Sequence, residues 1–219
     1  MSVIHKSKLD RTAVASRAVI EEDFSVSAKT SIFRTQASVP LRYLFERGLI
    51  RGSVLNFGKG RYSTDSEAII TIAGNCTDYD YTYAPLDLAL LGHNFHTVFA
   101  GYVANTLPRR SRDVIYAQIA NATRLHDGRA YFAVRSDKDR GIKGEPFYDY
   151  DLNGQLIVDG VITSKGTYQI GFSCEQMLNE LEGFFSYARV ICYKSGYMIA
   201  ECAHEPFADD SEQRQLSIV

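Results

Sequence analysis

The 219-residue sequence predicts an α/β fold: a mostly parallel, twisted sheet with helices on both faces and a C-terminal antiparallel hairpin. Two observations predict it. Between residues 53 and 135, short apolar runs alternate with segments of helical periodicity, as in a parallel sheet with right-handed crossovers. Near the end of the chain, the apolar runs 186–193 and 197–203 are separated only by Lys194-Ser195-Gly196, which is typical of a tight hairpin.

The central stretch, residues 53–80, predicts a nucleotide site. An apolar run ends at Gly58, and Gly58-Lys59-Gly60 forms a turn in which glycine lets the backbone approach a ligand. A helix is expected at 65–73, with Thr64 as its cap. Asp80 follows the next apolar-aromatic segment, where an acid receives ribose hydroxyls in nucleotide-binding α/β folds.

The other elements are expected in chain order. Pro40 suits the first turn of a helix at 39–50, and Gly48 and Gly52 mark its end. Residues 136–157 are polar and rich in Gly and Asp, so they are expected to form a long loop of the kind that binds ligands or acts as a lid. Further helices are expected at 11–22, 86–91, 109–123 and 174–185, strands at 54–57, 95–102 and 129–134, and a hairpin at 159–172 that turns near Lys165-Gly166.

Length and composition indicate one globular domain, since 45% of residues are hydrophobic and 23% are charged. We expect an N-terminal helical, basic segment (1–52) packed on the core, a core at 53–204 that includes an excursion at 136–172, and an acidic tail at 205–219. No apolar run is long enough to span a bilayer, and residues 1–8 precede no signal-peptide core, so a cytoplasmic location is expected. The cysteines form no CxxC pair and are expected to be free, reduced thiols: Cys76, Cys174, Cys192 and Cys202.

Charge is distributed unevenly along the chain. Residues 1–60 contain ten Lys/Arg and five Asp/Glu, whereas the rest contains 14 and 21, which gives balances of +5 and −7. A basic entry segment indicates contact with nucleic-acid phosphates, although a solvated basic face explains it equally well. The side chains considered for phosphate contact are Arg34, Arg42, Arg47 and Arg51.

Over roughly residues 29–204, the chain resembles class I S-adenosylmethionine-dependent methyltransferases, which have a Rossmann-like fold. The segment 55–60 is similar to their motif I, Asp80 stands at the ribose-binding acid, and 101–105 stands at motif IV. The resemblance implies S-adenosylmethionine as cofactor. The residues it implies for cofactor binding are Asn56, Gly58, Lys59, Gly60, Asp80 and Tyr81.

A narrower resemblance is to a methyltransferase-like group found beside bacterial and phage DNA-modification genes, which implies a DNA-modification or phage–host setting. It rests on short phrases in a shared order: Lys29-Thr30, Ser38-Val39-Pro40, Tyr79-Asp80-Tyr81, Gly101-Tyr102-Val103-Ala104-Asn105 and Lys165-Gly166-Thr167-Tyr168-Gln169.

The chain departs from the methyltransferase pattern at motif I. Asn56 replaces the usual acid, and a hydrogen bond to a charged group contributes about 1.5–3 kcal/mol, so the cofactor ammonium is expected to be held less well. Lys59 adds a cation, and Tyr62 is a bulky residue near the position of a common third glycine. The short spacing between Asp80 and the strand at 95 also indicates that one helix-strand unit is trimmed.

Methyl transfer mainly requires alignment of nucleophile and methyl group, with a base where the nucleophile is protonated. The chain lacks the Asn/Asp-Pro-Pro-aromatic loop and the Pro-Cys nucleophile of the two main DNA-base chemistries, so both lose support. We predict Tyr102 and Asn105 at the methyl-transfer mouth, with Tyr168 and Gln169 approaching from the excursion. Ordinary packing is the alternative for each tyrosine.

Two other functions stay open. A degenerate methyltransferase fold that acts as a binding or regulatory protein is favoured by Asn56, Lys59 and Tyr62. An NAD-dependent oxidoreductase shares the GxG turn and the acid, but Ser63 stands where its fingerprint has a third glycine. No metal site is predicted, because His93 and His96 lack a further paired ligand.

Overall fold

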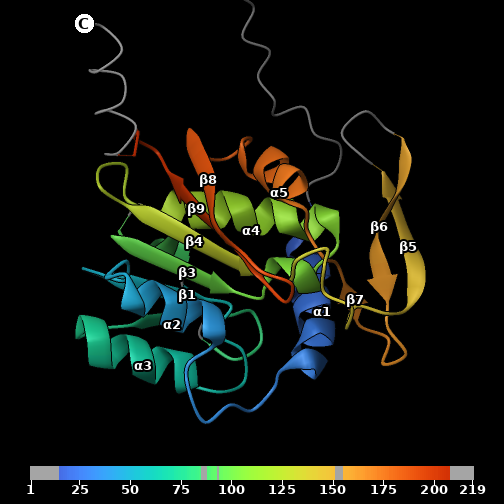
Figure 1. Ribbon diagram of the computed structural model, residues 1–219, viewed down its shortest axis with the longest axis horizontal. Coiled ribbons are helices and arrows are strands. Elements are labelled where there is room, and N and C mark those ends of the chain that lie inside the picture. The colour runs from blue at the N-terminus through green and yellow to red at the C-terminus, as the bar shows by residue number, and fades with distance from the viewer. Residues whose placement is uncertain (1–14, 85–87, 93, 151–154, 208–219) are drawn as a thin grey trace, which may run out of the picture.

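The computed structural model describes residues 15–84, 88–92, 94–150 and 155–207, which form two β-sheets with surrounding helices (Figure 1). The larger sheet has six strands in the order β2-β1-β3-β4-β9-β8, and the smaller has three in the order β5-β6-β7. The strands are β1 (Val54–Phe57), β2 (Thr77–Tyr79), β3 (Thr97–Gly101), β4 (Arg129–Val134), β5 (Glu145–Tyr150), β6 (Leu156–Ile162), β7 (Tyr168–Gln169), β8 (Tyr187–Tyr193) and β9 (Met198–Ala203). The helices are α1 (Arg17–Ser27), α2 (Val39–Glu46), α3 (Thr64–Ala73), α4 (Arg109–Ala122) and α5 (Cys174–Leu181), with short 3-10 turns η1 (Ala28–Thr30), η2 (Leu88–Leu91) and η3 (Ala104–Thr106).

The large sheet confirms the predicted fold class. Strand β1 pairs in parallel with both β2 and β3, and β3 pairs in parallel with β4. Strand β9 is antiparallel to both β4 and β8, as the C-terminal hairpin predicted. The chain runs from β1 outward to β2 and then crosses back to β3, so the strand order reverses between β1 and β3. Open α/β sheets bind ligands at such a reversal, beyond the carboxyl ends of the strands.

Two apolar cores cover the two faces of this sheet. Helices α4 and α5 pack on one face together with α1, and α2 and α3 pack on the other (Figure 1). Alternation along β1 serves both cores: Val54 belongs to the α2/α3 side, and Leu55 and Phe57 belong to the α4/α5 side, all three with 0% exposure. This two-sided burial explains why β1 reads as a nearly continuous apolar run.

Several predicted helix bounds were wrong. Helix α1 begins at Arg17 rather than at residue 11, because the Ser16 hydroxyl caps it by accepting a hydrogen bond from the Val19 amide. Residues 1–14 of the predicted N-terminal segment lie outside the described ranges. Helices α2 and α5 end at Glu46 and Leu181, earlier than expected. Thr64 is the first residue of α3 and does not cap it; its hydroxyl donates to the Arg34 carbonyl over 3.0 Å.

The prediction of a long loop at 136–157 was also wrong, because residues 145–150 form strand β5 and pair with β6. Most β5 side chains are exposed, so the strand lacks the apolar alternation that reveals a half-buried one. The hairpin expected at 159–172 is confirmed by the pairing of β6 with β7, and Gly166 turns the chain at φ 69°. The short helix expected at 86–91 is the 3-10 turn η2, with residues 85–87 outside the described ranges, as is residue 93.

All four cysteines are free, as predicted. Within the described residues, no helix is both long and apolar enough to cross a membrane. No group of three or more His, Cys, Asp or Glu side chains able to hold a metal ion occurs in the same ranges. Of the predicted acidic tail, only residues 205–207 are described.

Candidate functional site

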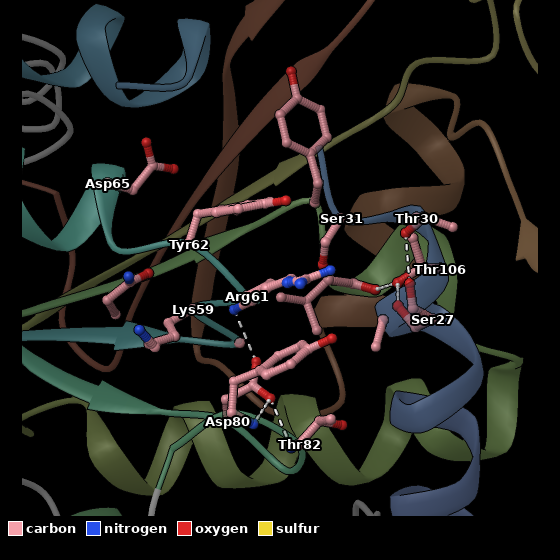
Figure 2. Close-up of a pocket in the computed structure, with 18 of the residues that line it drawn as sticks. Ser27, Thr30, Ser31, Lys59, Arg61, Tyr62, Asp65, Asp80, Thr82 and Thr106 are labelled. Atoms are coloured by element: carbon pink, nitrogen blue, oxygen red, sulfur yellow. Dashed lines mark hydrogen bonds between the residues drawn. The ribbon is translucent and has the colours of Figure 1, made fainter. Parts of the chain in front are cut away.

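A cleft lies at the strand-order reversal between β1 and β3 (Figure 2). Its floor is formed by the turns that follow β1, β2 and β3, and the segment 27–34 after α1 closes it from outside. Figure 2 shows the Arg61 side chain lying across the cleft, toward the segment with Thr30 and Ser31. The remaining cavity is about 130 Å³, smaller than the roughly 300–1,000 Å³ of typical small-molecule pockets. A nucleotide-sized ligand therefore requires Arg61 or the outer segment to move.

The turn after β1 requires glycine. Gly58 and Gly60 have φ values of 70° and 72°, in the left-handed region that side chains disfavour. A Cβ on Gly58 would lie 2.3 Å from Cγ2 of Val103. The backbone can therefore come close to a ligand here only because both positions lack side chains.

Asp80 ties this turn to the one after β2. Its Oδ2 accepts a hydrogen bond from the Gly60 amide over 2.9 Å, and its Oδ1 accepts from the amides of Thr82 and Tyr83 over 2.7 and 2.9 Å. The side chain is buried. A carboxylate has about four lone-pair positions, so three are taken and one on Oδ2 stays open to a ligand hydroxyl. The predicted acid thus also holds the turns after β1 and β2 together.

Asn56 belongs to a polar group on the α3 side of β1. Its Nδ2 donates to Oγ of Ser66 over 3.0 Å and to Oδ1 of Asp78 over 3.4 Å, and Ser66 donates to the same Asp78 oxygen over 2.7 Å. Nζ of Lys59 lies 3.8 Å from Oδ2 of Asp78. Because a carboxylate only accepts, the Asn56 nitrogen must face Asp78, which leaves its Oδ1 for the cleft. Asp78 lies within β2 and outside the segment similar to motif I, so the sequence did not predict its role.

Tyr102 lines the cleft at the carboxyl end of β3 with φ 61°. A non-glycine residue held there costs about 1–3 kcal/mol, and such strain clusters at functional sites. The Arg34 guanidinium carbon lies 5.7 Å from the centre of the Tyr102 ring. Burial raises the pKa of the Tyr102 phenol, and Arg34 opposes this shift. At neutral pH the phenol is therefore a hydrogen-bond donor rather than a base.

Six of the ten predicted residues line the cleft, and four do not. Asn105 instead donates to Gln169 Oε1 over 3.4 Å, and its Oδ1 accepts from the Arg135 amide over 3.4 Å, so both amide side chains join η3 to β7. The Tyr81 hydroxyl accepts from Gln118 Nε2 on α4 over 2.5 Å. The catalytic and binding roles of the ten residues stay predictions.

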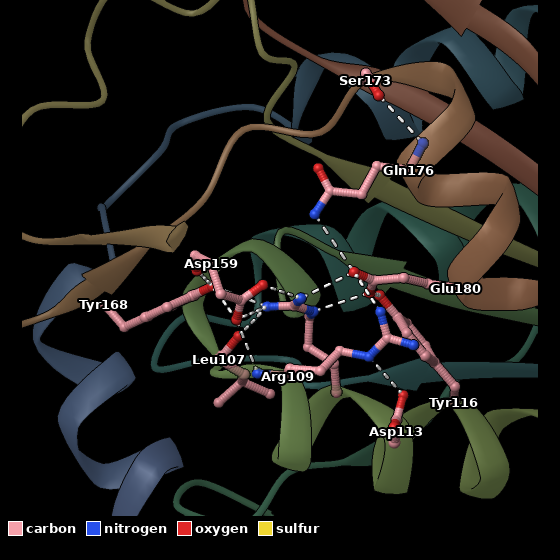
Figure 3. Close-up of polar contacts among 10 residues, drawn as sticks. Leu107, Arg109, Asp113, Tyr116, Asp159, Tyr168, Ser173, Gln176 and Glu180 are labelled. Carbon is pink, nitrogen blue, oxygen red and sulfur yellow. Dashed lines mark hydrogen bonds and ion pairs between the residues drawn. The ribbon is translucent and has the colours of Figure 1, made fainter. Parts of the chain in front are cut away.

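Tyr168, the fourth, belongs to a buried ionic cluster around Arg112 (Figure 3). The Arg112 guanidinium has 0% exposure and pairs with Asp159 of β6 over 2.7 and 3.1 Å and with Glu180 of α5 over 2.8 and 2.9 Å. Tyr116 donates to Glu180 over 3.0 Å. Burial disfavours the Glu180 charge, but Arg112 outweighs it and lowers the pKa of this carboxyl. The cluster fixes the small sheet and α5 to α4.

The similarity of this chain to known proteins lies in its structure. No protein-family model and no curated protein matches the sequence. Among solved structures, the DhpI–SAH complex superimposes with a TM-score of 0.55 at 16% identity over 88% of this chain and 100% of its own, and the DhpI-SAM-HEP complex with 0.54 at 15% over 86% and 95%. The Burkholderia thailandensis 1,6-didemethyltoxoflavin-N1-methyltransferase, with its substrate and S-adenosylhomocysteine bound, gives 0.55 at 14% over 84% and 87%. The chain therefore has the Rossmann-like fold of S-adenosylmethionine-dependent methyltransferases.

Proposed function

We propose that the chain binds S-adenosylmethionine in this cleft and transfers its methyl group to an acceptor. The observation that carries the proposal is the hydrogen bond from the Gly60 amide to Asp80 at the reversal of strand order. It brings the glycine turn and the ribose-type acid together in the place where α/β folds bind nucleotides. The structures with the same fold include complexes with S-adenosylmethionine and S-adenosylhomocysteine, which supports this choice of cofactor.

The side chains of the cleft fit this cofactor. The open lone pair of Asp80 suits a ribose hydroxyl, Asn56 Oδ1 suits the ammonium, and Arg61 supplies a cation for the carboxylate. When bound, the cofactor supplies an electrophilic methyl group on a sulfonium. Tyr102, protonated and fixed by its backbone, donates a hydrogen bond that orients the acceptor.

The predicted residues outside the cleft act by positioning. Asn105 and Gln169 hold η3, whose last residue, Thr106, lines the cleft. Tyr168 holds β7 through its hydrogen bond with Arg112. Substitution of these residues is expected to lower the turnover rate through displacement of the cleft wall, with no direct loss of a group that contacts the acceptor.

A DNA-modification or phage–host setting, in the cytoplasm, is the finer part of the proposal and rests on the resemblance of short phrases. Arg42 and Arg51, which belong to the basic segment 1–52, are exposed, as a nucleic-acid contact requires. Incubation of the protein with radiolabelled S-adenosylmethionine and unmodified DNA, RNA or small acceptors measures where the label goes. Transfer to small acceptors alone would contradict the DNA setting.

Calorimetric titration with S-adenosylmethionine and S-adenosylhomocysteine tests the central claim. We expect binding in the micromolar range, and thermal stabilisation by these ligands but not by NAD. Asp80→Ala should abolish the binding, whereas Glu67→Ala, a change at an exposed acid on α3, should leave it intact. No binding at millimolar ligand would favour a degenerate methyltransferase fold that acts as a binding or regulatory protein. Stabilisation by NAD would favour an oxidoreductase.

A further inference from the structure

The cleft carries positive charge that has no carboxylate partner. Three cations line the cleft, Arg34, Lys59 and Arg61, against two acids, Asp65 and Asp80. Lys59 is already engaged, because its Nζ lies 3.2 Å from Ser63 Oγ and 3.8 Å from Asp78. Arg34 and Arg61 are exposed, and neither forms an ion pair with any acid in the described ranges; each instead lies beside a tyrosine ring.

The two acids of the cleft are occupied by backbone donors. Asp65 Oδ1 accepts from the Ser38 amide over 2.7 Å, which anchors the start of α2. Asp80 accepts from three amides of the turns described above. Both carboxylates keep their charge, but these contacts hold them toward the loops, and neither forms an ion pair with Arg34 or Arg61. The cleft is therefore prepared for anionic groups that come with its ligands.

The two guanidinium groups lie at different ends of the site. Arg61 follows the glycine turn directly, next to the floor where the amino-acid part of the cofactor is proposed to bind. Arg34 lies over the ring of Tyr102, at the carboxyl end of β3, where the acceptor is proposed to approach. One cofactor carboxylate accounts for Arg61 and leaves Arg34 without an ionic partner.

We propose that the methyl acceptor carries an anionic group, a carboxylate or a phosphate, and that Arg34 binds this group. The inference rests on the proposed function and adds the substrate class. Arg34 is well placed, because Thr64 donates to its backbone carbonyl over 3.0 Å and so fixes the segment that carries it. The Ser31 hydroxyl lines the same wall and can donate to an anion oxygen, whereas the neighbouring Thr30 hydroxyl already donates to the Ser27 carbonyl over 2.7 Å (Figure 2).

The test titrates the protein, saturated with S-adenosylhomocysteine, with phenyl phosphate, benzoate and the neutral analogue phenol. We expect the two anions to bind and phenol not to bind. Arg34→Ala should weaken phenyl phosphate by about tenfold or more, and Arg34→Lys should weaken it less, because lysine keeps the charge but loses the planar fork. The Thr64 hydroxyl donates to the backbone carbonyl of Arg34, so both variants keep that hydrogen bond.

Two controls separate the roles of the arginines. Arg140→Ala should leave the affinities for S-adenosylhomocysteine and phenyl phosphate unchanged, since Arg140 is exposed and does not line the cleft. Arg61→Ala should weaken S-adenosylhomocysteine by about tenfold and leave phenyl phosphate on the saturated protein unchanged. If Arg34→Ala weakened the binding of S-adenosylhomocysteine and left that of phenyl phosphate unchanged, the assignment of Arg34 to the acceptor would be overturned.

The outcomes also separate this inference from the function beneath it. Wild-type protein that binds S-adenosylhomocysteine but neither anion, or binds phenol as well as phenyl phosphate, would refute the anionic acceptor alone. Wild-type protein that fails to bind S-adenosylhomocysteine would refute both. A competition arm with a short single-stranded oligonucleotide identifies the source of the anion: displacement of phenyl phosphate indicates a nucleic-acid phosphate, and no displacement indicates a free small molecule.

Discussion

Restoration of the usual acid at motif I should harm this protein. Asn56→Asp would place a carboxylate oxygen where Nδ2 now lies, 3.4 Å from Oδ1 of Asp78. Two unit charges at that separation repel by about 5 kcal/mol at an effective dielectric constant of about 20. Lys59, 3.8 Å from the other Asp78 oxygen, offsets part of this repulsion. We expect the free energy of unfolding at neutral pH to fall by about 2–3 kcal/mol.

A second change should rescue the first. In Asn56→Asp/Asp78→Asn the amide and the carboxylate exchange strands, so the hydrogen bond between β1 and β2 is kept and the repulsion is removed. The carboxylate would then face the cleft directly. Because hydrogen bonds to charged acceptors exceed neutral ones by about 1–1.5 kcal/mol, the double variant should bind S-adenosylhomocysteine about tenfold more tightly than the wild type.

Urea denaturation of the four proteins, with Asp78→Asn alone as the fourth, gives the coupling free energy between the two positions. Calorimetric titration with S-adenosylhomocysteine gives the second observable. If Asn56→Asp alone is as stable as the wild type and binds more tightly, then Asp78 does not determine the residue at position 56, and the reasoning is wrong.

Two further predictions concern stability. Gly58→Ala should lower the free energy of unfolding by more than about 2 kcal/mol, because its Cβ would lie 2.3 Å from Val103 Cγ2. Gly74→Ala is the control: Gly74 also has a positive φ, but open space surrounds it, so this change should cost only about 1 kcal/mol. Equal losses of the two variants in urea denaturation would contradict the steric reason. Glu180→Gln should cost about 3–5 kcal/mol, since it breaks a buried ion pair with Arg112. The folded-state pKa of Glu180 is lowered, so its contribution is present above pH 4.5 and is lost as the pH falls through the lower folded value; denaturation across this range should show a steeper acid loss in the wild type than in the variant.

The parts of the fold that the sequence predicted are those encoded locally. The run that ends at Gly58, the turn to Gly60 and the acid at Asp80 all lie within one strand-helix-strand unit, where spacing fixes geometry. The C-terminal hairpin is local too, since its strands are joined by the four residues 194–197. Strand β5 was missed because it is exposed on most positions and therefore has no burial pattern.

The parts that the sequence could not predict depend on partners far apart in the chain. Helical periodicity gave no reason to bury Arg112 in α4, because its partners Asp159 and Glu180 are 47 and 68 residues away. Asp78 could not be predicted for a different reason, because one acid within a short strand has no distinctive spacing. The arginine at position 34 reaches the cleft only because the segment after α1 crosses it.

The Arg112 cluster and the segment 27–34 are held with different strength. Movement of the small sheet away from α4 would break ion pairs whose rupture costs about 3–5 kcal/mol, and no described residue of that sheet lines the cleft. The segment 27–34 does border the cleft, and it is held by the Thr64 hydrogen bond and a Phe33–Tyr62 ring contact at 5.3 Å. Ligand exchange is therefore expected to pass beneath that segment, and the rate of product release should depend on how firmly Phe33 rests on Tyr62.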